Sequence, residues 1–376
     1  MQTKFHKIAL YCFSVLCFLW ISDAYGQAKE HPLTITNISL NRKTFFSDKD
    51  AAIKISYKLS GDAFVAIRFY NDRDIRVRTL SQNEMTASGS HSAEWDGKND
   101  SGEQLPSGVY IYTIEAKRNN GERVMYDPAD ETGGILLKVR EPLLDTESGE
   151  ISYVMPKAGM VRIRAGIKEG PLLKTIIDWE PMEAGKNVEK WDGKDKSGLI
   201  DLFRIPKREA HIFAYSLPDN CIILTSFPGS AWERSRDGSA VLSKTVPEYR
   251  AQKKTDPKLK YEHALHKKSV CHEPEFQVIF PPDSERTPEA ISILKGSVPV
   301  KIVISERDRH HLESERFEVM FFVDTVFIFE DEEGFTPFTY MWNTKDLSEG
   351  EHVFTVNIFS YDDHCGVESR KIIIRR

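Results

Sequence analysis

The sequence has few cysteines, no excess of positive charge and only one long apolar run. Only 5 of the 376 residues are cysteine, so a small disulfide-stapled scaffold is excluded. The formal net charge of -6 gives no overall basic field of the kind that draws proteins to nucleic acid. With 40% hydrophobic and 29% charged residues, the chain is neither wholly disordered nor a polytopic membrane protein. The composition predicts a globular chain of about two to four domains.

The long apolar run stands at the N-terminus. Lys4 and Lys7 precede it, the run itself covers residues 8–21, and the small-residue pattern Ala24-Tyr25-Gly26 follows. A charged start, an apolar centre and a small-residue exit are typical of a secretory signal peptide. An uncleaved anchor is the alternative, but the run is shorter than the roughly 20 residues that a spanning helix needs. We expect residues 1–26 to be a signal peptide, cleaved after Gly26, and the mature protein to be periplasmic, extracellular or at the cell surface.

A tryptophan turn occurs twice, 96 residues apart, at Trp95–Gly102 and Trp191–Gly198. The segments Ile55–Tyr57 and Ile151–Tyr153 precede the two copies at the same spacing. Asp-Gly and Ser-Gly within the turn supply the positive backbone angles that a tight turn needs. This internal repeat predicts two tandem modules in which each indole closes one end of a core.

Residues 33–139 alternate between apolar and polar positions and are interrupted at short intervals by Gly, Asp and Asn. Val65, Ile67 and Phe69 share one face of such a segment, for example, and 109–114 is rich in aromatic and branched residues. Period-two alternation with frequent turns is typical of an antiparallel sandwich. No amphipathic helix is indicated in this stretch.

The first copy of the turn is followed by Leu105-Pro106-x-Gly108-x-Tyr110, and together they resemble the immunoglobulin-like module of the flagellar hook-capping protein. The second copy keeps the tryptophan turn but lacks the Leu-Pro-x-Gly pattern, and its connection from Gly198 to Ala210 is longer. We therefore expect a first module at 33–139 and a degenerate second module at 147–227. The resemblance implies an all-β scaffold without catalytic residues. It does not imply a flagellar role, because the other regions of the hook-capping protein are absent.

Residues 276–376 predict a third module. Val298, Val300, Ile302 and Ile304 alternate, and 322–324 resembles the strand-and-turn signature of bacterial Ig-like modules in secreted and surface proteins. Thr325 stands where those modules usually have glycine. The predicted fold class is all-β: three tandem immunoglobulin-like antiparallel β-sandwiches joined by linkers and preceded by a signal peptide.

The segment 228–275 is predicted to be a basic linker. Eight basic residues face three acidic ones between Lys244 and Lys268. Charge runs are usually solvated, so an exposed linker between modules is the simpler interpretation. The alternative is a docking segment for an anionic polysaccharide, a lipid headgroup or another part of the cell envelope.

Three groups of residues suggest a bound metal ion or a disulfide. His263, His266, Cys271 and His272 have spacings that could hold zinc or copper, but an exposed linker explains them as well. Asp96, Asn99 and Asp100 suggest calcium, although the loop lacks the pattern of an EF-hand and turn chemistry explains the same residues. A Cys271–Cys365 disulfide is predicted from the Ig-like topology, in which the first strand, near Phe276, lies parallel to the last; the spacing alone does not establish the bridge. We predict no metal and no cofactor.

No catalytic constellation is predicted. The acidic residues at 330–333 and 362–363 fall in predicted turns, and His310 and His311 follow Asp308 in a predicted polar loop. General acid and base catalysis needs two environments that separate the pKa values of its groups. The chain contains no phosphate-binding glycine loop and no nucleophile motif. We predict that the protein is not an enzyme.

These observations predict a non-catalytic exported scaffold or protein-interaction protein, acting in adhesion or assembly at the bacterial cell envelope. The partner would be another exported or surface protein, with no nucleic acid and no membrane span. The alternative is a carbohydrate-binding or substrate-positioning accessory of a secreted hydrolase system. That function needs a platform of exposed aromatic side chains, and the candidates are Tyr110, Tyr112, Trp179 and Trp232.

Overall fold

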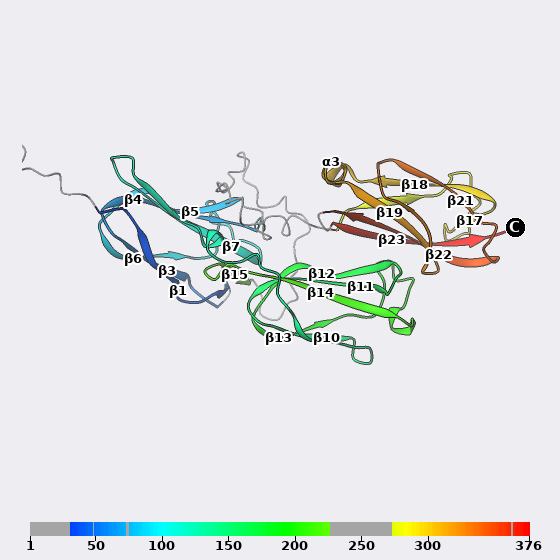
Figure 1. Cartoon of the computed structure of the whole chain (residues 1–376), viewed down its shortest axis with the longest axis horizontal. Coiled ribbons are helices and arrows are strands. Elements are labelled where there is room, and N and C mark those ends of the chain that lie inside the picture. Colours follow the sequence, from blue (N-terminus) through cyan, green and yellow to red (C-terminus); the bar gives the residue numbers. More distant parts are fainter. Residues whose placement is uncertain (1–30, 48, 73–74, 226–272, 362–363) are drawn as a thin grey trace, which may run out of the picture.

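The described part of the chain folds into mainly antiparallel β-sandwiches with very little helix, which confirms the predicted all-β class (Figure 1). The computed structural model describes residues 31–47, 49–72, 75–225, 273–361 and 364–376. The predicted signal peptide lies outside the described residues, as do most of the basic linker and, within it, Trp232, His263, His266, Cys271 and His272.

The first module is a sandwich of a three-stranded and a six-stranded sheet. The three-stranded sheet has the order β1 (Ile35–Leu40), β3 (Ile53–Leu59) and β6 (Gly89–Trp95). The other sheet has the order β2 (Thr44–Phe46), β15 (Ile222–Thr225), β7 (Gly108–Lys117), β4 (Ala63–Tyr70) and β5 (Arg76–Thr86), with β8 (Arg123–Tyr126) beside β7. Alternate residues of β3 are buried, as period-two patterning requires.

The second module repeats this plan, but both of its sheets have three strands. One sheet has the order β13 (Gly185–Lys190), β10 (Glu150–Met155) and β9 (Arg140–Asp145), and the other β12 (Leu172–Met182), β11 (Gly159–Ile167) and β14 (Arg208–Ser216). Strand β12 corresponds to β5 displaced by 96 residues at both ends. The longer connection after the second tryptophan turn contains a short 3-10 helix, η2 (Leu202–Arg204).

Strand β15 lies inside the range 147–227 that the sequence suggested for the second module, but it belongs to a sheet of the first. Ile223 is opposite Thr44 in a parallel pair with β2 and opposite Val109 in an antiparallel pair with β7. Ile222, Ile223 and Leu224 are all buried there. The second module is therefore inserted between β8 and β15 of the first. The sequence carries no signal for the sheet that this strand joins.

The third module pairs a three-stranded sheet with a five-stranded sheet. The first has the order β16 (Phe276–Ile279), β18 (Ser297–Ile304) and β21 (Phe338–Asn343). The second has the order β17 (Ser292–Leu294), β23 (Cys365–Ile374), β22 (Gly350–Ser360), β19 (Phe317–Val323) and β20 (Val326–Asp331).

The strand that runs parallel to β23 is β17, not the strand at Phe276 from which the disulfide was predicted. Strand β16 instead pairs antiparallel with β18 in the opposite sheet. Cys365 is buried at the start of β23, and Cys271 lies outside the described residues, so the bridge stays a prediction.

The expectation of a polar loop around His310 and His311 is wrong, because both lie in helix α3 (Glu306–Glu315). Asp308 and Leu312, one helical turn apart, are 3% and 1% exposed and face the module. Leu312 is the only apolar residue of the helix, so no helical periodicity was visible in the sequence. The available signal was a serine, Ser305, followed by two acids, Glu306 and Asp308, in the first helical turn.

Candidate functional site

The two tryptophan corners have the same geometry. Trp95 Nε1 donates to the Lys98 carbonyl at 3.0 Å, and Trp191 Nε1 donates to the Lys194 carbonyl at 2.9 Å. Trp95 is fully buried, and Trp191 is 6% exposed. Each indole belongs to the hydrophobic core of its own module. The repeat therefore closes cores, as the sequence predicted, and forms no open cleft.

The polar residues of the first corner serve the turn. Asp96 Oδ1 accepts from the Lys98 amide, Asn99 Oδ1 from the Ser101 and Glu103 amides, and Asp100 Oδ1 from the Thr79 amide. Gly97 has a φ of 77° and packs closely against Phe45, so a side chain there would be strained and crowded. These bonds account for the residues that suggested calcium without a metal ion.

The first and second modules share a separate apolar cluster at their junction. It joins residues of β7, β15 and the 3-10 helix η1 (Pro128–Asp130) to residues of β11, β12 and the segments beside them. Its buried members are Val109, Ile111, Ala129, Ala158, Met160, Trp179, Leu217, Cys221 and Ile223. Because the cluster contains no solvent-exposed member, separating the modules would expose a continuous apolar surface.

A buried charge lies beside this cluster. Arg162 of β11 is 1% exposed, and its guanidinium lies 4.6 Å from the ring of Trp179. Arg162 Nε and Nη2 both contact Asp178 Oδ1, at 2.9 and 2.8 Å. The other oxygen of Asp178 accepts from the backbone amide of Glu273 at 3.2 Å. A buried guanidinium is tolerated only when it is paired, and here its partner also holds the start of the third module.

The second and third modules are joined through a buried amide. Asn357 of β22 is fully buried; its Nδ2 donates to the Leu172 carbonyl and its Oδ1 accepts from the Leu172 amide, both at 2.8 Å. Val353, on the same strand, packs against the core cluster of the second module. Thr355 and Val367 are also fully buried.

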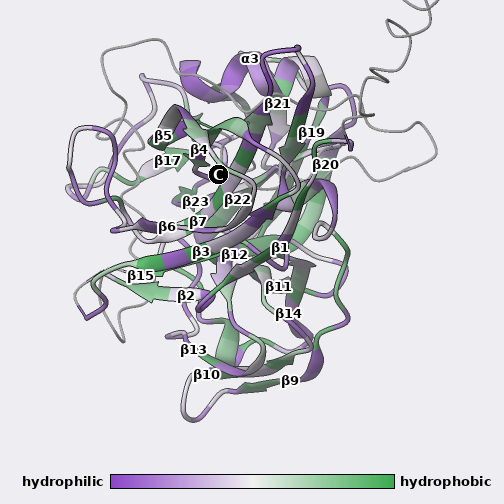
Figure 2. Ribbon diagram, turned by 90° about the vertical axis from the view of Figure 1, so that its left-hand side faces the viewer, coloured by the Kyte–Doolittle hydropathy of each residue, from purple (hydrophilic) through white to green (hydrophobic). Residues whose placement is uncertain are grey.

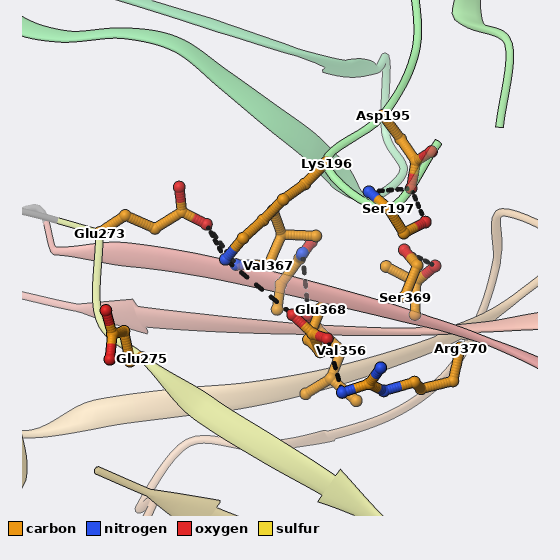
Figure 3. Close-up of polar contacts among 12 residues, drawn as sticks. Asp195, Lys196, Ser197, Glu273, Glu275, Val356, Val367, Glu368, Ser369 and Arg370 are labelled. Carbon is orange, nitrogen blue, oxygen red and sulfur yellow. Dashed lines mark hydrogen bonds and ion pairs between the residues drawn. The ribbon is translucent and has the colours of Figure 1, made fainter. Parts of the chain in front are cut away.

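The second tryptophan corner contributes an ion-pair network to this junction (Figure 3). Lys196 Nζ lies 2.9 Å from Glu273 Oε1 and 4.0 Å from Glu368 Oε2. Glu273 Oε1 also accepts from the Val367 amide at 3.3 Å, and Glu368 pairs with Arg370 at 2.9 Å. Figure 3 shows the corner segment with Asp195, Lys196 and Ser197 over strand β23. The repeated turn thus closes a core on one side and contacts the next module on the other.

The aromatic residues proposed as a glycan platform are not exposed. Tyr110, Tyr112 and Trp179 are 2%, 0% and 1% exposed. Burial raises the pKa values of the Tyr110 and Tyr112 hydroxyls well above their ordinary value. All three residues lie in strands, and their side chains point to the inward faces of the sheets. The expectation of an exposed platform is therefore wrong for these residues, and Trp232 lies outside the described part of the chain.

The described acids and histidines do not converge on a site. Within the described ranges, no group of three or more His, Cys, Asp or Glu side chains is placed to hold a metal ion. Glu330, Glu332 and Glu333 are exposed at the end of β20 and in the segment that follows. The rings of His311 and His364 contact each other in a tilted arrangement, with centroids 4.3 Å apart. No helix in the described part of the chain is long and apolar enough to cross a membrane.

The third module exposes apolar side chains on two of its edge strands. Strands β20 and β21, which lie at edges of its two sheets, approach each other, since Phe329 and Tyr340 stack with ring centroids 4.1 Å apart. Val326 is 65% exposed, Phe327 51% and Met341 57%. Figure 2 shows β20 beside β19 near the margin of the molecule in that view.

Residues 41–121 match the family model of the FlgD Ig-like domain. This confirms the resemblance predicted for the first module from its tryptophan turn. No curated protein matches the chain significantly.

Several solved structures show a distant similarity to the chain. A bacterial ice-binding adhesin of 1.5 MDa has 11% identity and a TM-score of 0.19, with 92% of this chain and 99% of that chain covered. The central fibronectin-III array of RIM-binding protein has 9% identity and a TM-score of 0.19, with 93% and 99% covered. A tetra-tandem repeat from the extending region of a large adhesion protein has 10% identity and a TM-score of 0.19, with 91% and 74% covered. Likenesses this distant add nothing to the fold that the strand pairing establishes.

Proposed function

We propose that this protein is a non-catalytic, exported scaffold of the bacterial cell envelope that binds another exported or surface protein through joined sandwich modules. The observation that carries the proposal is the construction of the module junctions. Independent binding modules need only flexible linkers between them. Here Arg162 and Asn357 are buried at the junctions, and each makes specific bonds that hold its neighbour. Such junctions favour a role in which the relative placement of the modules matters.

The export part of the proposal depends on residues 1–26, whose pattern is that of a signal peptide. Mass spectrometry of the N-terminal peptide of the mature protein, recovered from its native cell, tests it, with Gln27 or its cyclised form expected as the first residue. A mature protein that still begins at Met1 and fractionates with the cytoplasm would contradict export.

The scaffold role is tested by crosslinking in the native cell followed by affinity purification of the tagged full chain. We expect one exported or surface protein in constant ratio to the bait, and the same ratio when the exposed control residue Tyr361 is changed to Phe. A bait that captures no protein in constant ratio, or that turns over a substrate, would contradict the proposal.

The carbohydrate-binding alternative is less favoured because Tyr110, Tyr112 and Trp179 are buried. Its remaining candidate is Trp232. Retention of the full chain on insoluble polysaccharide, lost in Trp232→Ala, would replace the scaffold proposal with this one. Salt-sensitive retention on an anionic polysaccharide, unaffected by that variant, would instead support envelope contact by the basic linker.

A further inference from the structure

The five-stranded sheet of the third module ends in an apolar edge. Within the described part of the chain, β20 pairs with β19 and with no other strand. The backbone N–H and C=O groups on its other side therefore have no described strand partner. Soluble proteins usually protect such an edge with lysine, proline, an inward charge or a β-bulge. Residues 326–329 contain no lysine, proline or charged residue, and Val326 and Phe327 are more than half exposed.

An aromatic layer lies directly under this edge. Phe329 of β20 and Tyr340 of β21 are half-buried and stack on each other, and Phe321 lies 5.3 Å from Tyr340. Phe335, in the segment between the two edge strands, is 55% exposed. A strand added to β20 would cover rings that the module itself leaves partly in solvent, which provides apolar burial in addition to backbone hydrogen bonds.

The pairing of β20 with β19 limits what such a strand can do. Phe327 is opposite Phe322 and Phe329 is opposite Phe321, so Ile328 is the extra residue of a bulge. A bulge bends the strand and interrupts the ladder. A partner would therefore pair over short segments on either side of Ile328, and side-chain contacts would have to supply much of the affinity.

The far end of β20 is negatively charged. Glu330 and Glu332 lie near Glu318 of β19, and burial together with the charges of these two residues raises the pKa of Glu318. In the described ranges, no lysine or arginine forms an ion pair with any of the three. The edge thus combines an apolar half with an uncompensated acidic half.

We infer that β20 binds, by strand addition, an extended segment of an exported partner in which apolar and basic side chains alternate. The inference rests on the proposed scaffold function and names the surface that performs it. The acidic half favours a basic strand, because opposite charges across a strand pair stabilise it. A second copy of this chain fits less well, because β20 has no basic residue that could pair with Glu330 and Glu332 of its partner.

A synthetic probe tests this chemistry directly. The probe is a fluorescent peptide of about ten residues in which valine and lysine alternate, and its matched control carries glutamate in place of lysine. Anisotropy of the full mature chain titrated into each peptide should show binding of the lysine peptide that weakens as salt is raised. Equal binding of the glutamate peptide, or no binding of either, would overturn the inference.

Substitutions locate the binding. Phe327→Lys places a positive charge on the exposed edge, and Glu330→Gln removes one negative charge from the acidic half. Each should weaken binding of the lysine peptide, and for Phe327→Lys the affinity should fall by about ten-fold or more. Met341→Lys makes the same change at an equally exposed position on the other edge strand and should bind like the wild type. Circular dichroism verifies that all three variants fold. Binding that is insensitive to the β20 variants, or equally sensitive to Met341→Lys, contradicts the assignment.

Two further readouts separate this inference from its alternatives. Sedimentation that shows a dimer lost in Phe327→Lys would mean that β20 binds a second copy and not a basic strand. The crosslinking experiment in the native cell separates the inference from the proposed function. A partner captured equally by the wild type and by Phe327→Lys would leave the scaffold function standing and exclude β20 as its surface.

Discussion

The side-chain amide of Asn357 replaces a strand partner for Leu172, donating to its carbonyl and accepting from its amide at 2.8 Å each. Leu172 begins the edge strand β12 of the second module, whereas Asn357 lies within β22 of the third. One side chain of the third module thus satisfies both the amide and the carbonyl of a residue in the second module. The third module is held by this geometry as well as by contacts between apolar surfaces.

Replacing Asn357 by Ala should loosen this junction. Both backbone groups of the half-buried Leu172 would lose their partner, at a cost of about 1–3 kcal/mol. Denaturant unfolding should show the loss, and small-angle scattering should show a wider distribution of module orientations. Asn343→Ala, at an exposed amide on β21 that accepts from the Lys345 amide within its own module, is the matched control and should leave the distribution of module orientations unchanged. An Asn357→Ala protein that matches the wild type in both measurements would show that the junction does not depend on this pair.

The repeated corners should respond alike to one substitution. Trp95→Phe and Trp191→Phe each remove a buried N–H donor and part of a buried ring, so each should destabilise its module by about 2–4 kcal/mol. Thermal and denaturant unfolding measure the effect, with the exposed Tyr361→Phe as control. If either variant lost ligand binding while keeping wild-type stability, the indole would belong to a binding site and not to a core.

The Asp324 and His352 pair should make the third module more stable at lower pH. Burial by itself lowers the pKa of His352, but the hydrogen bonds to Asp324 Oδ2 at 2.6 Å and to the Ser348 carbonyl at 2.9 Å, with the charge of Asp324, outweigh it and raise the pKa. A raised pKa means that the folded state binds the proton more tightly than the unfolded chain. The stabilisation is therefore complete below the ordinary histidine value of about 6.5 and is lost as the pH rises through the folded pKa.

Urea unfolding at about pH 5.5 and about pH 8.5 measures this pH dependence. The Asp324→Asn variant should show a smaller difference between the two pH values, because the charge that favours protonated His352 is gone. A wild-type difference that persists unchanged in Asp324→Asn would assign the effect to another group.

Because it includes strand β15, the first module depends on a segment that follows the second module in the sequence. A fragment of residues 31–139 lacks β15, so β2 loses its parallel partner and β7 one of its neighbours. We expect this fragment to unfold without cooperativity, whereas residues 31–225 should show one cooperative transition. Heteronuclear NMR spectra of the two fragments, prepared alike, make the comparison. A dispersed spectrum from residues 31–139 alone would show that β15 is dispensable.

The sequence predicted the structure correctly where a residue and its immediate neighbours determine it. The Trp-Asp-Gly turn, its spacing of 96 residues and the alternation around Val65 predicted two related sandwiches, because turn angles and strand faces depend on nearby residues. Thr325 is a useful contrast. It stands where glycine was expected, yet it has a φ of 70°, held by the turn between β19 and β20.

Helix α3 and the buried tyrosines could not be predicted by the same means. The helix carries one apolar residue, so its stability depends on how Asp308 and Leu312 meet the rest of the module. Tyr110 and Tyr112 sit in a strand that is buried along most of its length, and a sequence of that kind does not show which aromatic residues remain exposed.

By itself, the sequence determined that the chain contains β-sandwich modules and that the first two modules share a repeated sequence pattern, because repeats, turns and strand patterns are local properties. Only the tertiary structure decided that β15 returns to the first module, that Lys196 and Asn357 join the second module to the third, and that β20 is left as an edge. Those outcomes depend on contacts between residues far apart in the chain, and no spacing or periodicity in the sequence encodes them.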